Sequence, residues 1–223
     1  MVVNLESQNE LFLIIGKELK KRVECYAIGE SAMIYHGAKR ETKDIDLVFS
    51  NERDQKEIVN LLKRNGFKER LTRLVYIKRL AHLKKQSPIM LEKDEFRIDL
   101  FNQEVICFYL TKEIENRVTD LFEFGNLFVK IISPEDIILL KCATERAGDR
   151  IDALELIKLF KINWDIIINE SVEQTKLGEN IFPVFLYDFL LELKEDLKAE
   201  IPNDVLKKLM EISEKELSKR LKK

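Results

Sequence analysis

Residues 24–49 contain the feature that most constrains the fold of this chain: a glycine turn followed by two acids on a strand. An apolar stretch over residues 25–28 predicts a short strand, which turns at Gly29 into a brief helix. A charged loop then leads to a second predicted strand that carries Asp44 and Asp46. Alternate side chains of a strand point from one face, so these carboxylates would lie about 6–7 Å apart at the backbone.

This pair of carboxylates is the kind of arrangement that holds a hard divalent cation. Like charges placed side by side repel one another unless a cation lies between them. Proteins bind Mg²⁺ through one or two carboxylates together with the phosphates of a substrate. The predicted helix that begins at Gly29 offers backbone N–H groups to a phosphate. The stretch therefore predicts a metal site beside a phosphate site.

Composition favours a globular protein and excludes several other classes. The 223 residues suffice for one large domain, or for a domain with a smaller companion. A formal net charge of −2 supplies no global basic field, so bulk electrostatics do not support nucleic-acid binding. The longest apolar run, residues 11–15, is far too short to span a bilayer, and the start of the chain is polar. We therefore expect a cytoplasmic protein with no membrane partner.

Cysteine usage points to a reducing compartment. Cys25, Cys107 and Cys142 are widely spaced, and each lies in an apolar run. We expect buried free thiols, and a structural zinc site is not expected because the chain has no Cys-x-x-Cys and only two histidines. The content of Lys, Glu and Ile leans towards a thermophilic source.

Hydrophobic periodicity predicts alternating helices and strands before residue 133. Helices are expected over residues 5–22 and 52–64, and a short helix over 104–110. The expected strands are apolar runs bounded by polar turns, over residues 74–77, 89–91, 96–101, 117–124 and 127–132. Gly125 and Asn126 predict a hairpin turn between the last two strands. A strand, a helix and a strand in succession indicate an α/β arrangement.

A helical region is predicted to follow. Ser133 and Pro134, followed by two acids, are typical of a helix start, and this helix should run to about Arg146. We expect Gly148 to break it and a further helix to follow over residues 149–160. From residue 164 onward the pattern is helical, with the remaining prolines, Pro183 and Pro202, near helix starts.

Asp99 is a third candidate acid. It lies in the middle of the apolar strand expected over residues 96–101, where an unpaired carboxylate would be costly. A cation shared with Asp44 and Asp46 would supply a partner. The alternative is an ordinary salt bridge to Arg97 or to another cation.

The residues around the glycine turn resemble a known superfamily. The matching residues are Ile28, Gly29, Ala32, Tyr35, Gly37, Arg40, Thr42, Lys43, Asp44, Ile45, Asp46 and Leu47. This pattern resembles the minimal and AbiEii-like proteins of the DNA polymerase β-type nucleotidyltransferase superfamily. The resemblance covers about residues 20–160, including the strand with Asp99 and the segment from Ser133 to Asp152. Arg-x-Thr-x-Asp-Ile-Asp-Leu behind a glycine turn is far more specific than a lone Asp-x-Asp.

The resemblance implies a fold. The expected fold is α/β (α+β), with a mixed β-sheet nucleotidyltransferase core that is flanked by helices. We place this domain at residues 1–162 and a C-terminal helical region at residues 163–223.

The resemblance also implies transfer of a nucleotidyl group from an NTP to a hydroxyl acceptor, which could be RNA, a protein or a small molecule. In that reading Asp44, Asp46 and Asp99 are the catalytic acids and bind two Mg²⁺ ions, with Asp99 as the candidate base. The expected nucleotide-binding residues are Gly29, Ser31, Arg40, Lys43 and Lys141. AbiEii-type toxins belong to toxin–antitoxin pairs, so an antitoxin is a candidate partner.

One residue departs from the pattern of that superfamily. The turn usually carries Gly-Gly or Gly-Ser, whereas Glu30 follows Gly29 here. A carboxylate beside a triphosphate is repulsive by roughly 1–4 kcal/mol at about 4 Å in a partly wet site. Either Glu30 points away and Ser31 takes over the phosphate contact, or NTP binding is weakened. The competing hypothesis is therefore a catalytically weakened binding protein on the same fold.

Plainer explanations exist for the other candidates. Asp44 and Asp46 could pair with neighbouring basic residues at an exposed strand start. Lys141 could pack its stem on the core while its ammonium group reaches solvent. Asp149, Arg150 and Asp152 are more often part of a solvated helix start than of a site.

Overall fold

The computed structural model describes residues 2–70, 88–144 and 146–221. The chain forms two compact units. Unit 1 comprises residues 1–106 and 110–133, and unit 2 comprises residues 107–109 and 134–223. The units part at Ser133, whereas the division expected at residue 162 follows the family resemblance and stays a prediction.

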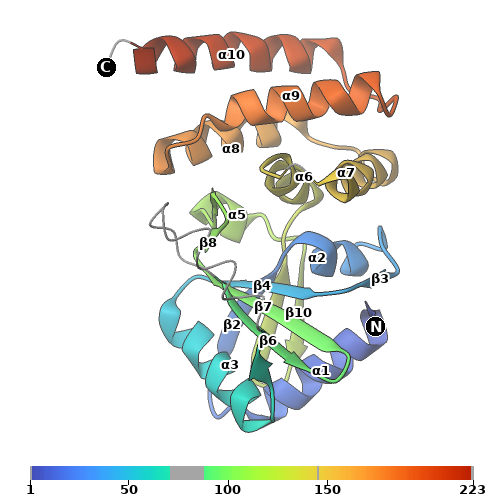
Figure 1. The fold of residues 1–223 in the computed structure, drawn as a ribbon, viewed down its shortest axis with the longest axis vertical. Coiled ribbons are helices and arrows are strands. Elements are labelled where there is room, and N and C mark those ends of the chain that lie inside the picture. Colours follow the sequence, from blue (N-terminus) through green and yellow to red (C-terminus); the bar gives the residue numbers. More distant parts are fainter. Residues whose placement is uncertain (1, 71–87, 145, 222–223) are drawn as a thin grey trace. The chain divides into compact units, whose positions relative to one another are not determined.

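Unit 1 is built on a mixed sheet (Figure 1). Its strands run in the order β10-β11-β2-β4-β7-β6-β5. The strands of this path are β2 (Val23–Ala27), β4 (Ile45–Phe49), β5 (Lys68–Glu69), β6 (Ile89–Lys93), β7 (Phe96–Asn102), β10 (Asp120–Phe124) and β11 (Leu127–Ile131). The pairs β11–β2 and β4–β7 are parallel, and the other neighbours along the path are antiparallel. The mixed α/β sheet that the sequence predicts is confirmed.

Short strands complete this unit. β8 (Glu104–Val105) pairs with the end of β7, and β1 (Val3–Asn4) pairs with β3 (Glu41–Thr42) in a separate antiparallel ladder. The hairpin turn expected at Gly125 is confirmed between β10 and β11, and this glycine has φ 63°, in the left-handed region that favours glycine.

The helices that the structure describes in unit 1 are α1 (Leu5–Glu18), α2 (Gly29–Tyr35), α3 (Glu52–Arg64) and α5 (Lys112–Asn116). Side chains cap the starts of α1, α3 and α5, whereas the start of α2 has no side-chain cap. Asn4 and Ser7 form a capping box at the start of α1, and Asn51 accepts a hydrogen bond from the N–H of Asp54 at the start of α3. Both α1 and α3 contact one another and the sheet, so their apolar sides form the core with it.

Unit 2 is helical apart from β9 (Phe108–Tyr109). Its helices are α6 (Pro134–Cys142), α7 (Ala147–Leu159), α8 (Trp164–Leu177), α9 (Phe182–Glu195) and α10 (Asn203–Leu221). As predicted, Pro183 lies in the first turn of α9 and Pro202 directly precedes α10. The side-chain amide of Gln174 in α8 bonds both backbone groups of Tyr109, at 2.7 and 2.8 Å, which ties β9 to the helices.

Two expected features are wrong, and the strand expected over residues 74–77 lies outside the described residues. Residues 104–110 do not form a helix, because Ile106 has φ 61°, which a right-handed helix excludes. Gly148 does not end a helix but lies in the first turn of α7, and the preceding helix already ends at Cys142. All three cysteines are buried, as expected.

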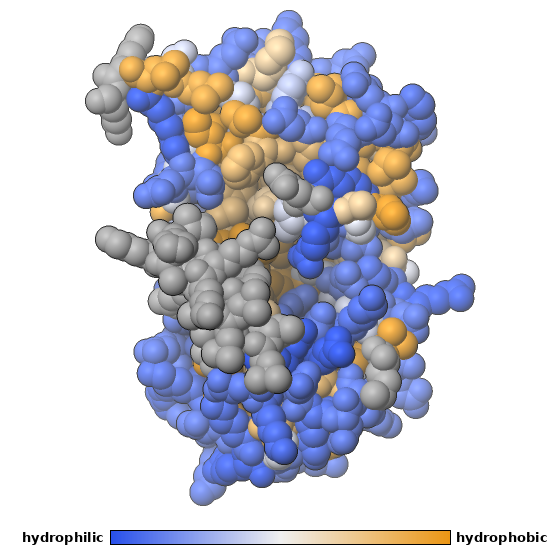
Figure 2. Space-filling model, in the orientation of Figure 1, coloured by the Kyte–Doolittle hydropathy of each residue, from blue (hydrophilic) through white to orange (hydrophobic). Residues whose placement is uncertain are grey.

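Exposed apolar residues are numerous on unit 2. Figure 2 shows apolar surface over the helices of this unit on the face in view. The large apolar residues that are exposed there are Ile151, Leu159, Leu177, Phe185, Leu197, Met210, Leu217 and Leu221. Within residues 2–70, 88–144 and 146–221, none of the helices combines the length and apolarity that crossing a membrane requires.

Backbone contact fixes α1 on the hairpin of β10 and β11. The N–H of Asn126 donates to the carbonyl of Gly16 at 3.0 Å. A Cβ atom on Gly16 would lie 1.4 Å from the carbonyl oxygen of Phe124, so only glycine permits this approach.

We expect Gly16→Ala to destabilise the protein by at least about 3 kcal/mol, since the new methyl group meets backbone and cannot be accommodated by a side-chain shift. Urea unfolding followed by circular dichroism measures this change. Gly148→Ala is the matched control, because nothing lies within 4 Å of the position that its methyl group would take and the residue is helical. That change should be neutral or stabilising by up to about 1 kcal/mol. Equal effects of the two substitutions would contradict the packing argument.

Candidate active site

The pairing of β4 and β7 places the acids together. In this parallel ladder Asp46 and Asp99 are direct partners. Directly paired residues of neighbouring strands point from the same face of a sheet. Asp44 immediately precedes β4, two residues before Asp46. Asp44, Asp46 and Asp99 therefore meet on one face of the sheet in unit 1.

Arg70, which follows β5, joins two of these acids. Its Nη1 atom lies 2.9 Å from Oδ1 of Asp44 and 3.1 Å from Oδ1 of Asp99. The partner of Asp99 is thus a cation other than its neighbour on the strand, Arg97. Sequence reasoning missed Arg70, because no local pattern links it to acids 26 and 29 residues away.

Burial changes the acidity of Asp99. This residue is 8% exposed, and loss of solvent raises its pKa to about 6, with repulsion from Asp44 acting in the same direction. The charge and hydrogen bond of Arg70 oppose the increase without cancelling it. Asp99 therefore titrates closer to neutral pH than an ordinary aspartate.

The acids fit a divalent cation chemically, although they are not gathered around a common point. Carboxylate oxygens are the ligands that Mg²⁺ prefers. Among the residues that the structure describes, no set of three or more acidic, histidine or cysteine side chains is arranged as a metal cage. Asp44 and Asp99 are both in contact with a guanidinium nitrogen of Arg70 instead.

Gly29 allows α2 to begin directly against the acids. Its φ is 54°, and a Cβ at this position would lie 3.4 Å from Oδ2 of Asp46. The preceding N–H, that of Ile28, donates to the carbonyl of Asp46 at 3.2 Å. The glycine turn and the acidic strand are therefore one local structure, as their spacing in the sequence suggests.

Ser31 and Thr42 hold the backbone of the acidic segment. Ser31 is fully buried, and its Oγ accepts a hydrogen bond from the N–H of Asp46 at 2.9 Å. Oγ1 of Thr42 lies 3.0 Å from the carbonyl oxygen of Asp44. Both hydroxyl groups act here as positioning groups for the acids.

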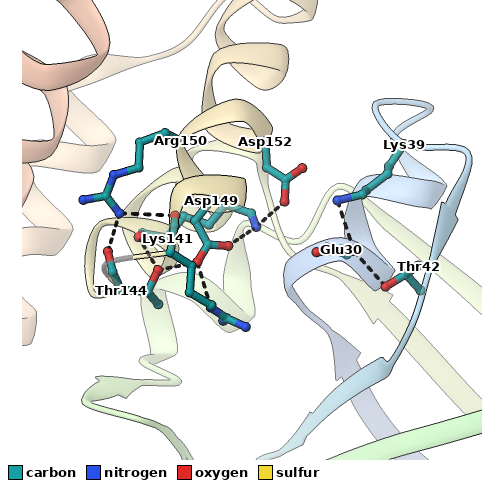
Figure 3. A network of polar contacts seen from close by, with 9 residues as sticks. Glu30, Lys39, Thr42, Lys141, Thr144, Asp149, Arg150 and Asp152 are labelled. Carbon is teal, nitrogen blue, oxygen red and sulfur yellow. Dashed lines mark hydrogen bonds and ion pairs between the residues drawn. The ribbon is translucent and has the colours of Figure 1, made fainter. Parts of the chain in front are cut away.

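Glu30 has its own charge partners. Its Oε2 lies 3.0 Å from Nζ of Lys39 and 2.9 Å from Oγ1 of Thr42, as Figure 3 shows. The remaining loop cations, Arg40 and Lys43, are exposed on either side of β3. The carboxylate of Glu30 is therefore partly neutralised, which weakens the repulsion that the sequence predicts towards a phosphate.

Lys141 lies in unit 2, in a buried cluster of charges. Its Nζ is 2.7 Å from Oδ1 of Asp149 and 2.6 Å from Oδ2 of Asp152 (Figure 3). The cluster joins α6 to α7, and Thr144 and Arg146 also contact Asp149. Burial alone would raise the pKa of Asp149, but the hydrogen bond and charge of Lys141 hold it below its usual value.

These contacts correct two of the plainer explanations. The ammonium group of Lys141 does not reach solvent, because the residue is only 4% exposed. Asp149 and Asp152 are not a solvated helix start, since both are buried against this lysine. The physical reason is that two buried carboxylates require a cation. Lys141 of α6 is the cation that pairs with both aspartates of α7.

A comparison with protein families gives a match. The family model described as "Nucleotidyltransferase of unknown function (DUF6036)" matches residues 7–200. A comparison with curated proteins gives no match.

The similar solved structures include the following two. One is the crystal structure of ANT(2″)-Ia in complex with adenylyl-2″-tobramycin, with 17% identity and a TM-score of 0.42 over 83% of this chain and 98% of that one. The other is an antigenic nucleotidyltransferase-like protein from Paracoccidioides brasiliensis, with 16% identity and a TM-score of 0.46 over 92% of this chain and 99% of that one. At TM-scores below 0.5 neither likeness carries an argument here.

The family match covers most of the chain, including the glycine turn, the acids of β4 and β7 and the charge cluster of α6 and α7. This chain belongs to the nucleotidyltransferase family DUF6036.

Proposed function

We propose that this protein transfers a nucleotidyl group from an NTP to a hydroxyl acceptor in a Mg²⁺-dependent reaction. The observation that carries the proposal is the meeting of Asp44, Asp46 and Asp99 on one sheet face, beside a glycine turn. Membership of a nucleotidyltransferase family supports the same reaction type.

Each acid has a stated role in this proposal. Asp44 and Asp46 would hold two Mg²⁺ ions, and Asp99 would complete the second site. When bound, these ions supply charge neutralisation to the triphosphate and lower the pKa of the acceptor hydroxyl. The acceptor oxygen bonds to the α-phosphorus, the bond to the β-phosphate breaks, and pyrophosphate leaves. Asp99 is the proposed base for the hydroxyl proton.

The nucleotide-binding residues remain proposals. The N–H groups at the start of α2, with Gly29 and Ser31, are proposed to face the phosphates. Arg40 and Lys43 would approach from the exposed loop around β3. Lys141 would need to exchange Asp149 or Asp152 for a phosphate.

A binding protein with weakened catalysis is the second candidate. The observation that favours it is Glu30, which lies in the turn that is proposed to face the phosphates. The ion pair with Lys39 neutralises the charge of Glu30 only in part. Such a protein would keep the fold and bind nucleotide without transferring it.

The acceptor is proposed to be RNA, a protein or a small molecule. The resemblance to AbiEii-type toxins makes an antitoxin the candidate partner. The exposed apolar residues of α7 to α10 support contact with another protein, because clustered apolar surface is characteristic of interaction sites.

We expect Asp44→Ala and Asp46→Ala each to lower nucleotidyl transfer more than about 100-fold, because metal ions contribute several kcal/mol of transition-state stabilisation. The assay incubates the protein with Mg²⁺, each of four α-labelled NTPs and pools of RNA, protein and small-molecule acceptors. Asp120→Ala, an exposed acid on β10, is the matched control and should retain full activity. Nucleotide binding without label transfer, in every combination, would instead favour the weakened binding protein.

The raised pKa of Asp99 predicts a pH dependence of stability. Its pKa is about 6 in the folded protein and about 3.9 in the unfolded chain, so the folded state binds the proton more tightly. The contribution of Asp99 therefore falls as pH rises from about 4 to about 6, by roughly 2–3 kcal/mol in total. The stability of Asp99→Asn relative to wild type should therefore increase as the pH rises through this window. Above pH 7 the difference between the two proteins should stay nearly constant. Urea unfolding at pH 4.5 and 7.5 measures the difference, and a difference that is independent of pH would contradict the prediction.

Lys141→Ala should destabilise the protein by about 3–5 kcal/mol, because it leaves Asp149 and Asp152 buried without their cation. Thermal and urea unfolding measure this effect. Lys158→Ala, an exposed lysine of α7, is the control and should change stability by less than about 0.5 kcal/mol.

The same cluster separates a structural role of Lys141 from phosphate binding. The triple variant Lys141→Met/Asp149→Asn/Asp152→Asn removes all three charges and should recover most of the lost stability. If Lys141 contacts the triphosphate, the triple variant will still bind nucleotide more weakly than wild type. Unchanged nucleotide affinity would assign Lys141 a structural role alone.

A further inference from the structure

Arg70 contacts the atoms that a metal ion would use. One nitrogen of its guanidinium group lies against an oxygen of Asp44 and an oxygen of Asp99. Its side chain is 14% exposed and that of Asp99 is 12% exposed, so their contact is largely withdrawn from solvent, whereas the side chain of Asp44 is 36% exposed. At this depth an ion pair is screened much less than one on the surface.

A divalent cation and the guanidinium group compete for these oxygens. Mg²⁺ binds carboxylate oxygens at about 2.0–2.1 Å, which would bring it close to a nitrogen already 2.9–3.1 Å from the same atoms. Two positive charges at such a separation repel strongly in a partly buried site. Arg70 and a metal ion therefore compete for Asp44 and Asp99.

Arg70 has an acidic neighbour beyond these two. Its Nε lies 4.0 Å from Oε2 of Glu92 on β6, the strand that pairs with β7. A guanidinium group presents several N–H donors in a planar fork, which suits phosphate oxygens better than a lysine ammonium group does. An arginine that leaves Asp44 and Asp99 would therefore have donor groups suited to a phosphate.

We propose that Arg70 is an exchangeable counterion, which neutralises Asp44 and Asp99 until they take up a divalent cation and then binds the triphosphate. This inference rests on the proposed nucleotidyl transfer and assigns its site a further nucleotide-binding residue. Arg70 directly contacts the proposed metal ligands, whereas Arg40 and Lys43 are exposed and Lys141 is held by two aspartates.

The exchange predicts two effects of opposite sign. Without nucleotide, Arg70→Gln should bind Mn²⁺ about 10-fold more tightly than wild type, because the competing charge is gone. With Mn²⁺ at saturation, the same variant should bind tripolyphosphate about 10-fold more weakly, because a phosphate ligand is lost. Electron paramagnetic resonance of free Mn²⁺ measures the first affinity, and isothermal titration calorimetry measures the second. Tripolyphosphate makes the result independent of the nucleotide base.

The controls separate exchange from a structural role. Arg70→Gln retains a hydrogen-bond donor for Asp99, and Arg70→Lys retains the positive charge without the planar fork. If one of these variants fails to fold, the other still tests the exchange. Arg70→Lys should keep the Mn²⁺ affinity of wild type and lose part of the tripolyphosphate affinity. Arg97→Ala, an exposed arginine on β7, should change neither affinity. An arginine with only a structural role would weaken both affinities when it is replaced.

The failure of the exchange can be told apart from the failure of the proposed function. If Asp44→Ala abolishes Mn²⁺ binding while Arg70→Gln weakens it or leaves it unchanged, the metal site stands and the exchange is wrong. If wild type does not bind Mn²⁺ and Arg70→Gln does, the exchange is supported. If neither wild type nor any Arg70 variant binds Mn²⁺ or tripolyphosphate, both the exchange and the proposed function are overturned.

Discussion

Repulsion among the carboxylates of β4 and β7 is the physical constraint that the surrounding residues of unit 1 must offset. The parallel pairing sets Asp46 beside Asp99, and Asp44 follows from its place two residues earlier. Strand geometry thus imposes a concentration of negative charge that local sequence alone does not relieve. Gly29, which leaves room for the carboxylate of Asp46, and Ser31, which holds its backbone, give this segment its shape.

The two units neutralise their buried acids in different ways. Lys141 is enclosed by Asp149 and Asp152, and all three side chains are less than a tenth exposed, so removing the cation would leave two stranded charges. Arg70 joins two acids as well, but the side chain of Asp44 is 36% exposed. Solvent can therefore replace part of what Arg70 supplies, and a cation from solution can reach the same oxygens. The first arrangement is suited to holding two helices together, and the second to exchange.

The parts of this structure that the sequence predicted are those determined locally. The acids, the glycine turn and α3 follow from spacing and capping within about fifteen residues, and the strand with Asp99 follows from alternation. Arg70 could not be predicted, because its contacts depend on which strands become neighbours in the sheet. The helix expected over residues 104–110 was wrong for another reason. Ile106 has a positive φ, a backbone conformation that β-branched residues rarely adopt.

Glu30 shows how one departure from a pattern is absorbed by its surroundings. By sequence alone its carboxylate would oppose a triphosphate, yet it accepts a hydrogen bond from Thr42 and pairs with Lys39. Thr42 also contacts the backbone carbonyl of Asp44, so its hydroxyl group links Glu30 to the acidic segment. The charge that most directly governs access to Asp44 and Asp99 is therefore the positive charge of Arg70. Release of that arginine, more than the carboxylate in the turn, decides whether the acids can bind a metal ion.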